Sequence, residues 1–397
     1  MKYRFAGCEI DIEGHRLLVG GEPRVVEPQV FDLLRHMVEN PDRLIRRDEL
    51  IDVVWSGRIV SDSAISARIS AARAAVGDDG TRQSIIKTVP RRGSRFVVTT
   101  EVVAEGSVSA PHAPDRVASP PQHVRFCTSR DGTRIAYATT GAGHPLVRAG
   151  HWLTHIEHDW QSPVWRPFLN ELGKSFQVTR YDQRGNGLSD WTADDFSLDR
   201  FVDDLEAVTE GAGLDRFALY GTSQGAAISI AYAARHPHRV SRLVLLGGYV
   251  QGRLVRGNEE ERDTGKAMLT LIRHGWGKPG SAFLKSFASM YIPGGRQDQI
   301  ESLAELQRQT TSPENATALR AAVDSFDVSD LLRQVSCPTL VLHARNDGVH
   351  PIEQGRALAA GIPDAEFVML ESDNHAILQN EPAWNVLFNE LGRFVGS

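Results

Sequence analysis

The sequence is poor in cysteine and in long apolar runs. Its 397 residues include only three cysteines, Cys8, Cys127 and Cys337, which are scattered and form no C-x-x-C pair, so neither a disulfide framework nor a zinc site is expected. No apolar stretch approaches the roughly 18 residues that a membrane-spanning helix requires, and the N-terminus lacks the apolar core of a signal peptide. We therefore expect a cytoplasmic protein with no membrane contact, no metal and no cofactor.

Acidic residues are missing from one short segment, although the chain as a whole has a net charge of −6. Residues 81–100 contain one lysine and four arginines but no Asp or Glu. Residues 1–100 hold 16 Lys and Arg against 14 Asp and Glu, a net charge of +2, so the remaining residues have a net charge of −8. A local excess of positive charge in an acidic chain is the pattern that a DNA contact requires.

A linker is expected at residues 101–122, which contain four prolines, many small polar residues and no aromatic residue. It separates a first domain, residues 1–100, from a second domain, residues 123–397. In the first domain the apolar spacing predicts a helix that begins at Pro28, a second helix at Arg47–Trp55, and a third that is capped by Ser61 or Asp62 and ends at Val76.

A basic hairpin is expected after the third helix. The strands Ile85–Val89 and Phe96–Thr99 flank a tip at residues 90–94. A helix followed by a basic hairpin is typical of a winged helix-turn-helix, an α+β fold in which the helix enters the major groove and the arginines of the wing reach phosphates or the minor groove. The candidate DNA contacts are Ser63, Ser66, Arg68, Ser70 and Arg73 on the helix, and Arg91, Arg92 and Arg95 in the wing.

Residues 3–98 resemble the DNA-binding domain of the OmpR/PhoB-type and CadC-like bacterial regulators. The resemblance rests on residues 27–34, 50–55, 60–65 and 86–96, the last being similar to the wing signature of that family. It implies binding to double-stranded DNA. Because the linker disfavours rigid coupling between the domains and dimers match paired half-sites, we also expect a homodimer. No phosphoacceptor receiver domain precedes the module and no CadC-like membrane helix follows it, so we expect neither phosphorylation nor a membrane signal as the input.

The second domain alternates strands and helices, which predicts a doubly wound, mostly parallel sheet with helices on both faces. The pattern is interrupted at residues 249–335, which are expected to form a helical lid. Its larger side chains could line a pocket: Met268, Trp276, Phe283, Phe287, Met290 and Tyr291.

A G-x-S-x-G sequence, residues 221–225, lies between an apolar strand and an apolar helix, as a nucleophile elbow does. A serine hydroxyl needs a base and an orienting acid, and in α/β hydrolases these follow in the order Ser, Asp, His. Ser223 is the expected nucleophile, Asp347 the acid and His375 the base. Asp373 and Asp324 are alternative acids, but neither follows a strand and turn as Asp347 does.

An oxyanion would be bound by the backbone N–H of Gln224 and by a second donor from the loop after residues 145–149. Trp152 is the expected second donor, with His151 one position away. The sequence Gly150-His151 replaces the usual His-Gly, which puts the oxyanion hole in question. His151, His155 and His158 recur at helical spacing, but no H-E-x-x-H pattern accompanies them, so a metal site is not expected.

Residues 150–155, 159–165 and 181–190 resemble α/β hydrolases that are fused to regulatory output domains. We therefore expect a DNA-binding transcriptional regulator whose α/β-hydrolase-fold domain senses, and could also hydrolyse, a small-molecule ligand such as an organic ester or lactone. The alternative is an active serine carboxylic-ester hydrolase with an accessory DNA-binding domain. A third hypothesis, a protein-interaction module, rests only on the acidic surplus of the second domain.

Overall fold

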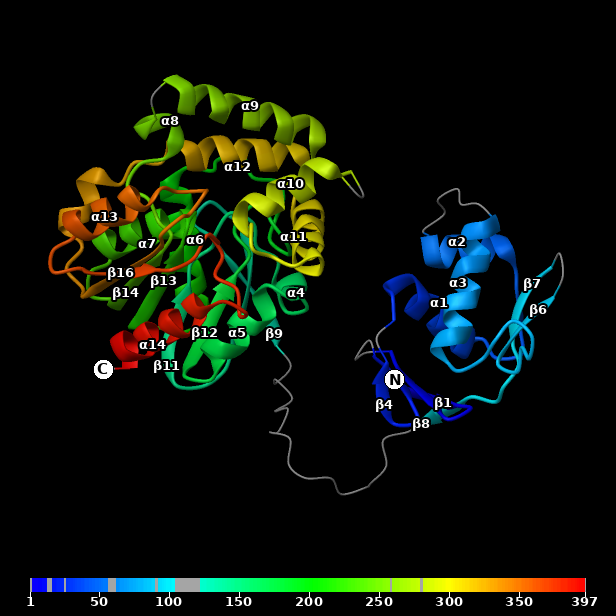
Figure 1. Cartoon of the computed structure of the whole chain (residues 1–397). Helices are drawn as coiled ribbons and strands as arrows, with labels where there is room; N and C mark the ends of the chain where they lie inside the picture. The colour runs from blue at the N-terminus through cyan, green and yellow to red at the C-terminus, as the bar shows by residue number, and fades with distance from the viewer. Residues whose placement is uncertain are drawn as a thin grey trace. The chain divides into compact units, whose positions relative to one another are not determined.

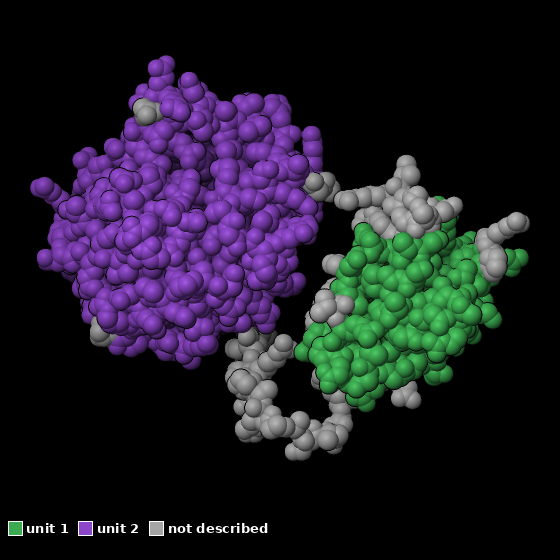
Figure 2. All heavy atoms as spheres, viewed as in Figure 1, with its two compact units in different colours: residues 1–116 green, residues 117–397 purple. Residues whose placement is uncertain are grey.

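The computed structural model describes residues 2–12, 16–24, 26–55, 62–89, 92–103, 122–257, 259–278 and 281–396. The chain divides into two compact units, residues 1–116 and 117–397 (Figure 2). The division falls inside the segment that the sequence predicts to be a linker, of which residues 104–121 lie outside the described residues. Within the described ranges, no helix is both long enough and apolar enough to cross a membrane.

The first unit begins with an antiparallel sheet in the order β4-β3-β2-β1-β8. The strands are β1 (Lys2–Phe5), β2 (Cys8–Asp11), β3 (Arg16–Val19), β4 (Glu22–Arg24) and β8 (Glu101–Val103). The expected linker therefore begins too early, because Glu101–Val103 pairs with β1 in the register Lys2 to Val103. Pairing along the backbone satisfies the edge of β1, a long-range contact that the local composition of residues 101–103 does not reveal.

Three helices and a small second sheet complete this unit. They are α1 (Pro28–Glu39), α2 (Arg47–Trp55), α3 (Asp62–Ala75), and the strands β5 (Leu44–Ile45), β6 (Ile86–Val89) and β7 (Gly93–Phe96). The second hairpin strand thus lies three residues earlier than the sequence predicts. At Gly93 a Cβ atom would lie 2.0 Å from the carbonyl oxygen of Ile45, so the close pairing of β7 with β5 requires a glycine there.

The second unit is built on an eight-stranded sheet in the order β16-β15-β14-β13-β11-β12-β10-β9 (Figure 1). The strands are β9 (His123–Thr128), β10 (Arg134–Thr140), β11 (His144–Arg148), β12 (Phe176–Tyr181), β13 (Phe217–Thr222), β14 (Val240–Leu246), β15 (Thr339–Ala344) and β16 (Glu366–Leu370). Strand β10 is antiparallel to both β9 and β12, whereas the other neighbouring pairs are parallel. The mostly parallel sheet expected from the sequence is therefore present.

Both faces of the sheet are buried, as a parallel sheet requires. Along β13, Phe217 and Leu219 face one apolar core and Ala218 and Tyr220 face the other. The first core contains residues of α6 (Leu198–Gly211), α7 (Gln224–Arg235) and α13 (Ile352–Gly361). The second contains residues of α5 (Trp165–Gly173) and α14 (Pro382–Gly396). Helices on both faces make the fold doubly wound. Because most of the strands are parallel, their carboxyl ends lie at one edge of the sheet.

The chain leaves the sheet after β14 and returns at β15. The described residues between them form α8 (Arg253–Arg256), α9 (Glu259–Gly275), α10 (Ala282–Tyr291), α11 (Gln297–Thr310), α12 (Pro313–Ser325) and a 3-10 helix (Ser329–Gln334). In Figure 1 helices α8 to α12 lie together at one end of the unit, whereas the 3-10 helix packs against α7 and α13. They occupy the stretch expected to be a lid.

Arg184 anchors the loop that follows β12 by ion pairs inside the protein. Its guanidinium, which is 1% exposed, donates to both carboxylate oxygens of Asp204 on α6 at 2.8 and 2.7 Å. It also donates to Asp131 at 2.8 Å in the turn between β9 and β10. Burial raises the pKa of Asp204, but the two hydrogen bonds from Arg184 oppose that rise. The arginine therefore joins three elements and has a structural role.

Replacing Arg184 by Met is expected to destabilise the second unit by about 3–5 kcal/mol, because the Asp204 carboxylate would be left buried and unpaired. Urea unfolding followed by tryptophan fluorescence measures this, since six of the seven tryptophans lie in this unit. The control is Arg134→Met, which removes an exposed pair with Asp190 and should change little. An equal effect of both substitutions would contradict the assigned role of Arg184.

Candidate functional site

Ser223 lies at a sharp turn between β13 and α7. Its backbone angles, φ 55° and ψ −123°, are strained for a residue with a Cβ atom. Gly221 and Gly225 permit the turn, because a Cβ atom at Gly221 would lie 2.5 Å from the Gly225 oxygen, and one at Gly225 would lie 2.8 Å from the Gly150 oxygen. The turn presents Ser223 beyond the end of the strand, as in a nucleophile elbow.

His375 and Asp347 form a buried pair beside this turn. Nδ1 of His375 lies 2.6 Å from Oδ2 of Asp347, and the backbone N–H groups of Val349 and His350 donate to Oδ1 at 2.8 and 3.0 Å. Burial alone would raise the pKa of Asp347, but the adjacent His375 and these hydrogen bonds lower it below its ordinary value. An ionised Asp347 holds the His375 proton on Nδ1 and leaves Nε2 as an acceptor.

A second histidine, which the sequence pattern does not single out, also contacts the serine. Nε2 of His350 lies 3.4 Å from Oγ of Ser223, whereas Nε2 of His375 is buried and has no partner among the described residues. The His350 ring stacks on Tyr249 with centroids 4.5 Å apart. Burial, reinforced by the charges of His375 and nearby arginines, lowers the pKa of His350 well below its ordinary value, so the ring is neutral.

The partners of the two histidines give them different roles at Ser223. Arg256 donates to Nδ1 of His350 at 3.4 Å, which leaves the single proton of that neutral ring on Nε2. His350 can therefore donate to the Ser223 oxygen but cannot accept its proton. His375 has the opposite tautomer, because its Nδ1–H donates a hydrogen bond to Asp347 and its Nε2 carries no proton. Of the two rings, only His375 is arranged to act as a base.

Gln183 connects the two expected oxyanion donors, a role that the sequence pattern does not reveal. The side-chain amide of Gln224 donates to Oε1 of Gln183 at 2.7 Å, and Nε2 of Gln183 donates to the carbonyl of Trp152 at 3.1 Å. All three residues are buried. Gln224 is the first residue of α7, so its backbone N–H has no acceptor one turn earlier in the helix. The bridge fixes the separation of the two backbone segments.

A narrow cavity of about 40 Å³ lies beside Ser223 and His375. Its walls include the rings of Trp152, Trp165 and Tyr291, and two leucines, Leu303 and Leu306, project from α11. Of the lid side chains expected to line a pocket, Tyr291 does so. Trp276 and Phe287 instead pack against the Trp152 ring, with centroids 6.2 and 6.1 Å away. The mostly apolar wall of the cavity suits an apolar ligand, which enters only when the side chains of the wall move, because the present space holds little more than a few water molecules.

The alternatives named from the sequence lie elsewhere. Asp324 is buried and paired with Arg320 at 2.8 Å, and exposed Asp373 accepts a hydrogen bond from Asn346 at 2.7 Å. His151 is an exception, because it lines the cavity, where its Nε2 accepts a hydrogen bond from Arg148 at 2.8 Å; Nδ1 of His155 accepts the N–H of His158 at 3.4 Å. Among the described residues, no group of three or more His, Cys, Asp and Glu side chains could hold a metal ion.

The expected DNA contacts divide into exposed and internally bonded side chains. Ser66 and Ser70 on α3 are exposed, as is Arg92 at the end of the hairpin tip. Arg68 forms an ion pair with Glu27, and Arg95 forms one with Asp42 at 3.6 Å. The side chain of Ser63 and the whole of Arg91 lie outside the described residues. The exposed serines leave one side of α3 small and polar.

Arg73 does not fit the expected DNA contact. Its side chain is 6% exposed, and its guanidinium donates to the carbonyl of Ile86 at 2.9 and 2.7 Å and to Thr88 at 2.8 Å. Because it follows Ile69 by four residues, Arg73 lies on the apolar side of α3 and ties the helix to β6. That spacing is visible in the sequence and points to the role that the structure shows.

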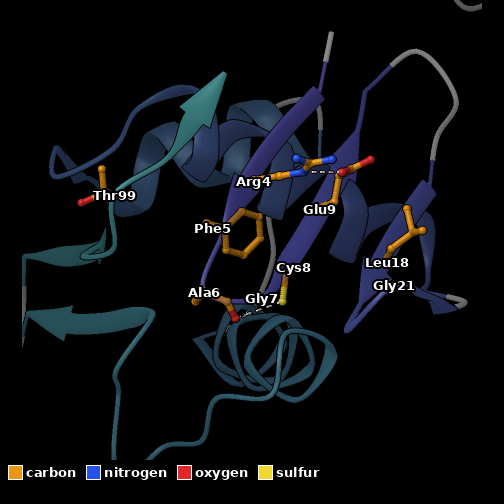
Figure 3. Close-up of a pocket in the computed structure, with 9 residues that line it drawn as sticks. All are labelled: Arg4, Phe5, Ala6, Gly7, Cys8, Glu9, Leu18, Gly21 and Thr99. Atoms are coloured by element: carbon orange, nitrogen blue, oxygen red, sulfur yellow. Dashed lines mark hydrogen bonds and ion pairs between the residues drawn. The ribbon is translucent and has the colours of Figure 1, made fainter. Parts of the chain in front are cut away.

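A hollow in the first unit contrasts with the cavity beside Ser223. It lies open at the turn between β1 and β2 and at Thr99, with an ion pair between Arg4 and Glu9 at 2.7 Å on its wall (Figure 3). Cys8 borders it, and burial raises the pKa of this thiol, which keeps it protonated and unreactive. The charges on its wall are paired, so the hollow offers little to a specific ligand.

Two family models match this chain. One, described as the alpha/beta hydrolase fold, matches residues 157–382, more than half of the 397 residues. The chain therefore belongs to the alpha/beta hydrolase fold family. The other, described as transcriptional regulatory protein, C terminal, matches residues 21–96 and indicates that the first unit is a DNA-binding domain of a transcription regulator.

Curated relatives and solved structures agree on the second unit. The pimeloyl-acyl-carrier-protein methyl ester esterase of Nitrosomonas europaea is 29% identical over 247 residues, 61% of this chain and 92% of that protein. The non-heme chloroperoxidase CPO-A1 of Kitasatospora aureofaciens is 26% identical over 265 residues, 64% of this chain and 92% of its own. A hydrolase from Pseudomonas aeruginosa superposes with a TM-score of 0.58 at 21% identity, covering 69% of this chain and 98% of that one.

Replacing Gln183 by Leu is expected to lower kcat for para-nitrophenyl butyrate by about tenfold with little change in KM. The substitution removes the bridge between the Gln224 and Trp152 segments, and misplaced oxyanion donors weaken binding of the transition state more than binding of the substrate. The matched control is Gln177→Leu, an exposed glutamine on β12. A rise in KM at constant kcat would show that Gln183 shapes substrate binding instead.

The assignment of His375 as the base predicts different behaviour of the two histidines toward a fluorophosphonate. His375→Phe should slow labelling of Ser223 by at least about a hundredfold, the usual contribution of a general base. His350→Phe should slow it by less than about tenfold, since a hydrogen-bond donor is lost and the base remains. Mass spectrometry of the labelled chain measures both rates, with Ser223→Ala as the unlabelled control. The reverse order would make His350 the base.

Proposed function

We propose that this chain is a transcription regulator whose α/β-hydrolase domain binds a small organic ester or lactone beside Ser223. The observation that carries the proposal is a mostly apolar cavity at Ser223 and His375, in the same chain as a domain of the transcription-regulator type. The esterase among the relatives supports an ester as the ligand class. The substrate of that esterase is not assigned to this chain, because the two sequences are only 29% identical.

In the proposed chemistry Ser223 attacks the ester carbonyl while His375 takes the hydroxyl proton. Asp347 stabilises the imidazolium that forms, and the backbone N–H groups of Gln224 and Trp152 bind the oxyanion. His375 then donates its proton to the leaving oxygen, and water releases the acyl group by the same steps. Slow turnover would let the domain clear its own ligand and so reset the regulator.

On the DNA side, α3 lies in the major groove and the hairpin of β6 and β7 acts as the wing of a winged helix-turn-helix. The exposed Ser66 and Ser70 allow close approach to the base edges, while Arg92 reaches the phosphates. Arg68 and Arg95 join them only if DNA displaces the acidic partners Glu27 and Asp42. Binding as a homodimer to paired half-sites, and a cytoplasmic location, belong to this proposal.

The second candidate function is an active serine ester hydrolase with an accessory DNA-binding domain. It is favoured by the 2.6 Å pair of His375 and Asp347 and by the strained turn at Ser223. These features serve turnover and are unnecessary for a pure receptor. The two functions differ in one property, which is whether occupancy of the cavity changes the affinity for DNA.

A covalent occupant of the cavity separates the two functions. Full-length protein is first used to select binding sequences from random duplex DNA, and the Kd is then measured by anisotropy before and after fluorophosphonate labelling. A sensor should show a change of at least about fivefold, the lower end of allosteric coupling. Ser223→Ala, treated identically, should show none. Complete labelling with an unchanged Kd would reject the sensor and support the hydrolase. Failure to select any binding sequence would reject a role as a DNA-binding regulator.

A further inference from the structure

The cavity beside Ser223 is uncharged. Among the described residues that line it there is no Arg, Lys, Asp or Glu. Two buried arginines lie behind the wall, and both are engaged. Arg148 donates to His151 and lies 4.7 Å from the centroid of Trp165. Arg320 pairs with Asp324 and lies 5.7 Å from the centroid of Trp152. A carboxylate or ammonium group in this chamber would therefore be buried without a partner, which is strongly unfavourable. The ligand that fits is neutral.

Four buried polar atoms of the wall have no hydrogen-bond partner among the described residues: Nε2 of His375, Nε1 of Trp152, Oε1 of Gln307 on α11 and Nε1 of Trp165 at the start of α5. In the proposed chemistry His375 is the base and the Trp152 segment supplies an oxyanion donor, which leaves Gln307 and Trp165 without an assigned role. Both side chains are more than nine-tenths buried, at 2% and 8% exposure. A buried carboxamide oxygen or indole N–H without a partner costs free energy, so most such groups are hydrogen-bonded in the functional state of a protein. The first can only accept a hydrogen bond and the second can only donate one.

The segments that carry the two groups are joined before any ligand arrives. The hydroxyl of Ser162 accepts the backbone N–H of Trp165 at 3.4 Å and lies 3.2 Å from the hydroxyl of Ser302 on α11, the helix of Gln307. The Trp165 ring packs between the Arg148 guanidinium and the His151 ring, whose centroid is 4.9 Å away. Side chains fixed in this way lose little entropy when a ligand binds.

We propose that Gln307 and Trp165 form a polar recognition pair, and that the ligand is a neutral ester or lactone whose acyl part contains an amide. The amide N–H donates to Oε1 of Gln307, and the amide oxygen accepts from Nε1 of Trp165. An amide suits two groups on separate elements, because its donor and acceptor point in opposite directions. This inference rests on the proposed function, in which the reacting carbonyl lies at Ser223.

The test compares two para-nitrophenyl esters of equal chain length. One contains N-acetyl-γ-aminobutyrate, which has an amide in the acyl chain, and the other contains heptanoate, which has none. Wild-type protein should hydrolyse the amide-containing ester with a kcat/KM at least about tenfold higher, because the hydrocarbon leaves both groups of the recognition pair unpaired. Equal values for the two esters would overturn the inference.

Three variants locate the preference in the pair. Gln307→Leu and Trp165→Phe should each remove most of it, because each lowers kcat/KM for the amide-containing ester more than kcat/KM for heptanoate. The matched control Gln309→Leu replaces an exposed glutamine on the same helix and should leave both rates unchanged. Loss of both activities together in Gln307→Leu and Trp165→Phe would show that these residues only support the fold.

Failure of the proposed function gives a different pattern. If wild-type protein hydrolyses neither ester and Ser223 is not labelled by a fluorophosphonate, the hydrolase chemistry is rejected. Calorimetric binding of the two intact esters to Ser223→Ala then decides the inference, with the same tenfold preference expected in Kd. Hydrolysis of heptanoate at the rate of the amide-containing ester leaves the proposed function standing and rejects the recognition pair.

Discussion

The second unit depends on the strained turn at Ser223. A positive φ at a serine persists only where the surroundings impose it, and here three glycines make room for it. Gly221 and Gly225 let α7 fold back against β13 and the loop after β11. Gly247, with φ of 57°, follows β14, and a Cβ atom at this position would lie 3.1 Å from the His375 ring. The elements around Ser223 therefore pack so closely at these three positions that a side chain would not fit without a shift.

The same closeness explains why two histidines can lie at one serine without doing the same work. Inside a protein the tautomer of a neutral imidazole is set by the partner of its other nitrogen. Asp347 accepts a hydrogen bond from His375, and Arg256 donates one to His350, so the two rings present opposite character to Ser223. A search for the histidine nearest to the serine in this structure would select His350. The hydrogen-bond partners instead indicate His375 as the ring that can accept the serine proton.

The sequence predicted much of this arrangement, and its failures have physical causes. The strand ends, the elbow and the order of Ser223, Asp347 and His375 follow from local patterns, namely apolar strands followed by turn residues. Gln183 was missed because its role depends on two loops that meet only in the fold. His350 was missed because its neighbours, Arg256 and Tyr249, come from a distant segment of the chain. The early end assigned to the first domain overlooked β8, whose pairing with β1 is entirely long-range.

Helix α10 and the loop of His375 are joined by two backbone hydrogen bonds. The carbonyl of Tyr291, the last residue of α10, accepts the backbone N–H groups of His375 and Ala376 at 2.9 and 3.3 Å. Tyr291 also lines the cavity that holds the ligand in the proposed function. A ligand that displaces α10 must therefore move the loop of His375, and a change at His375 must move the wall of the cavity. Occupancy of the cavity and the position of His375 are then coupled through these two hydrogen bonds.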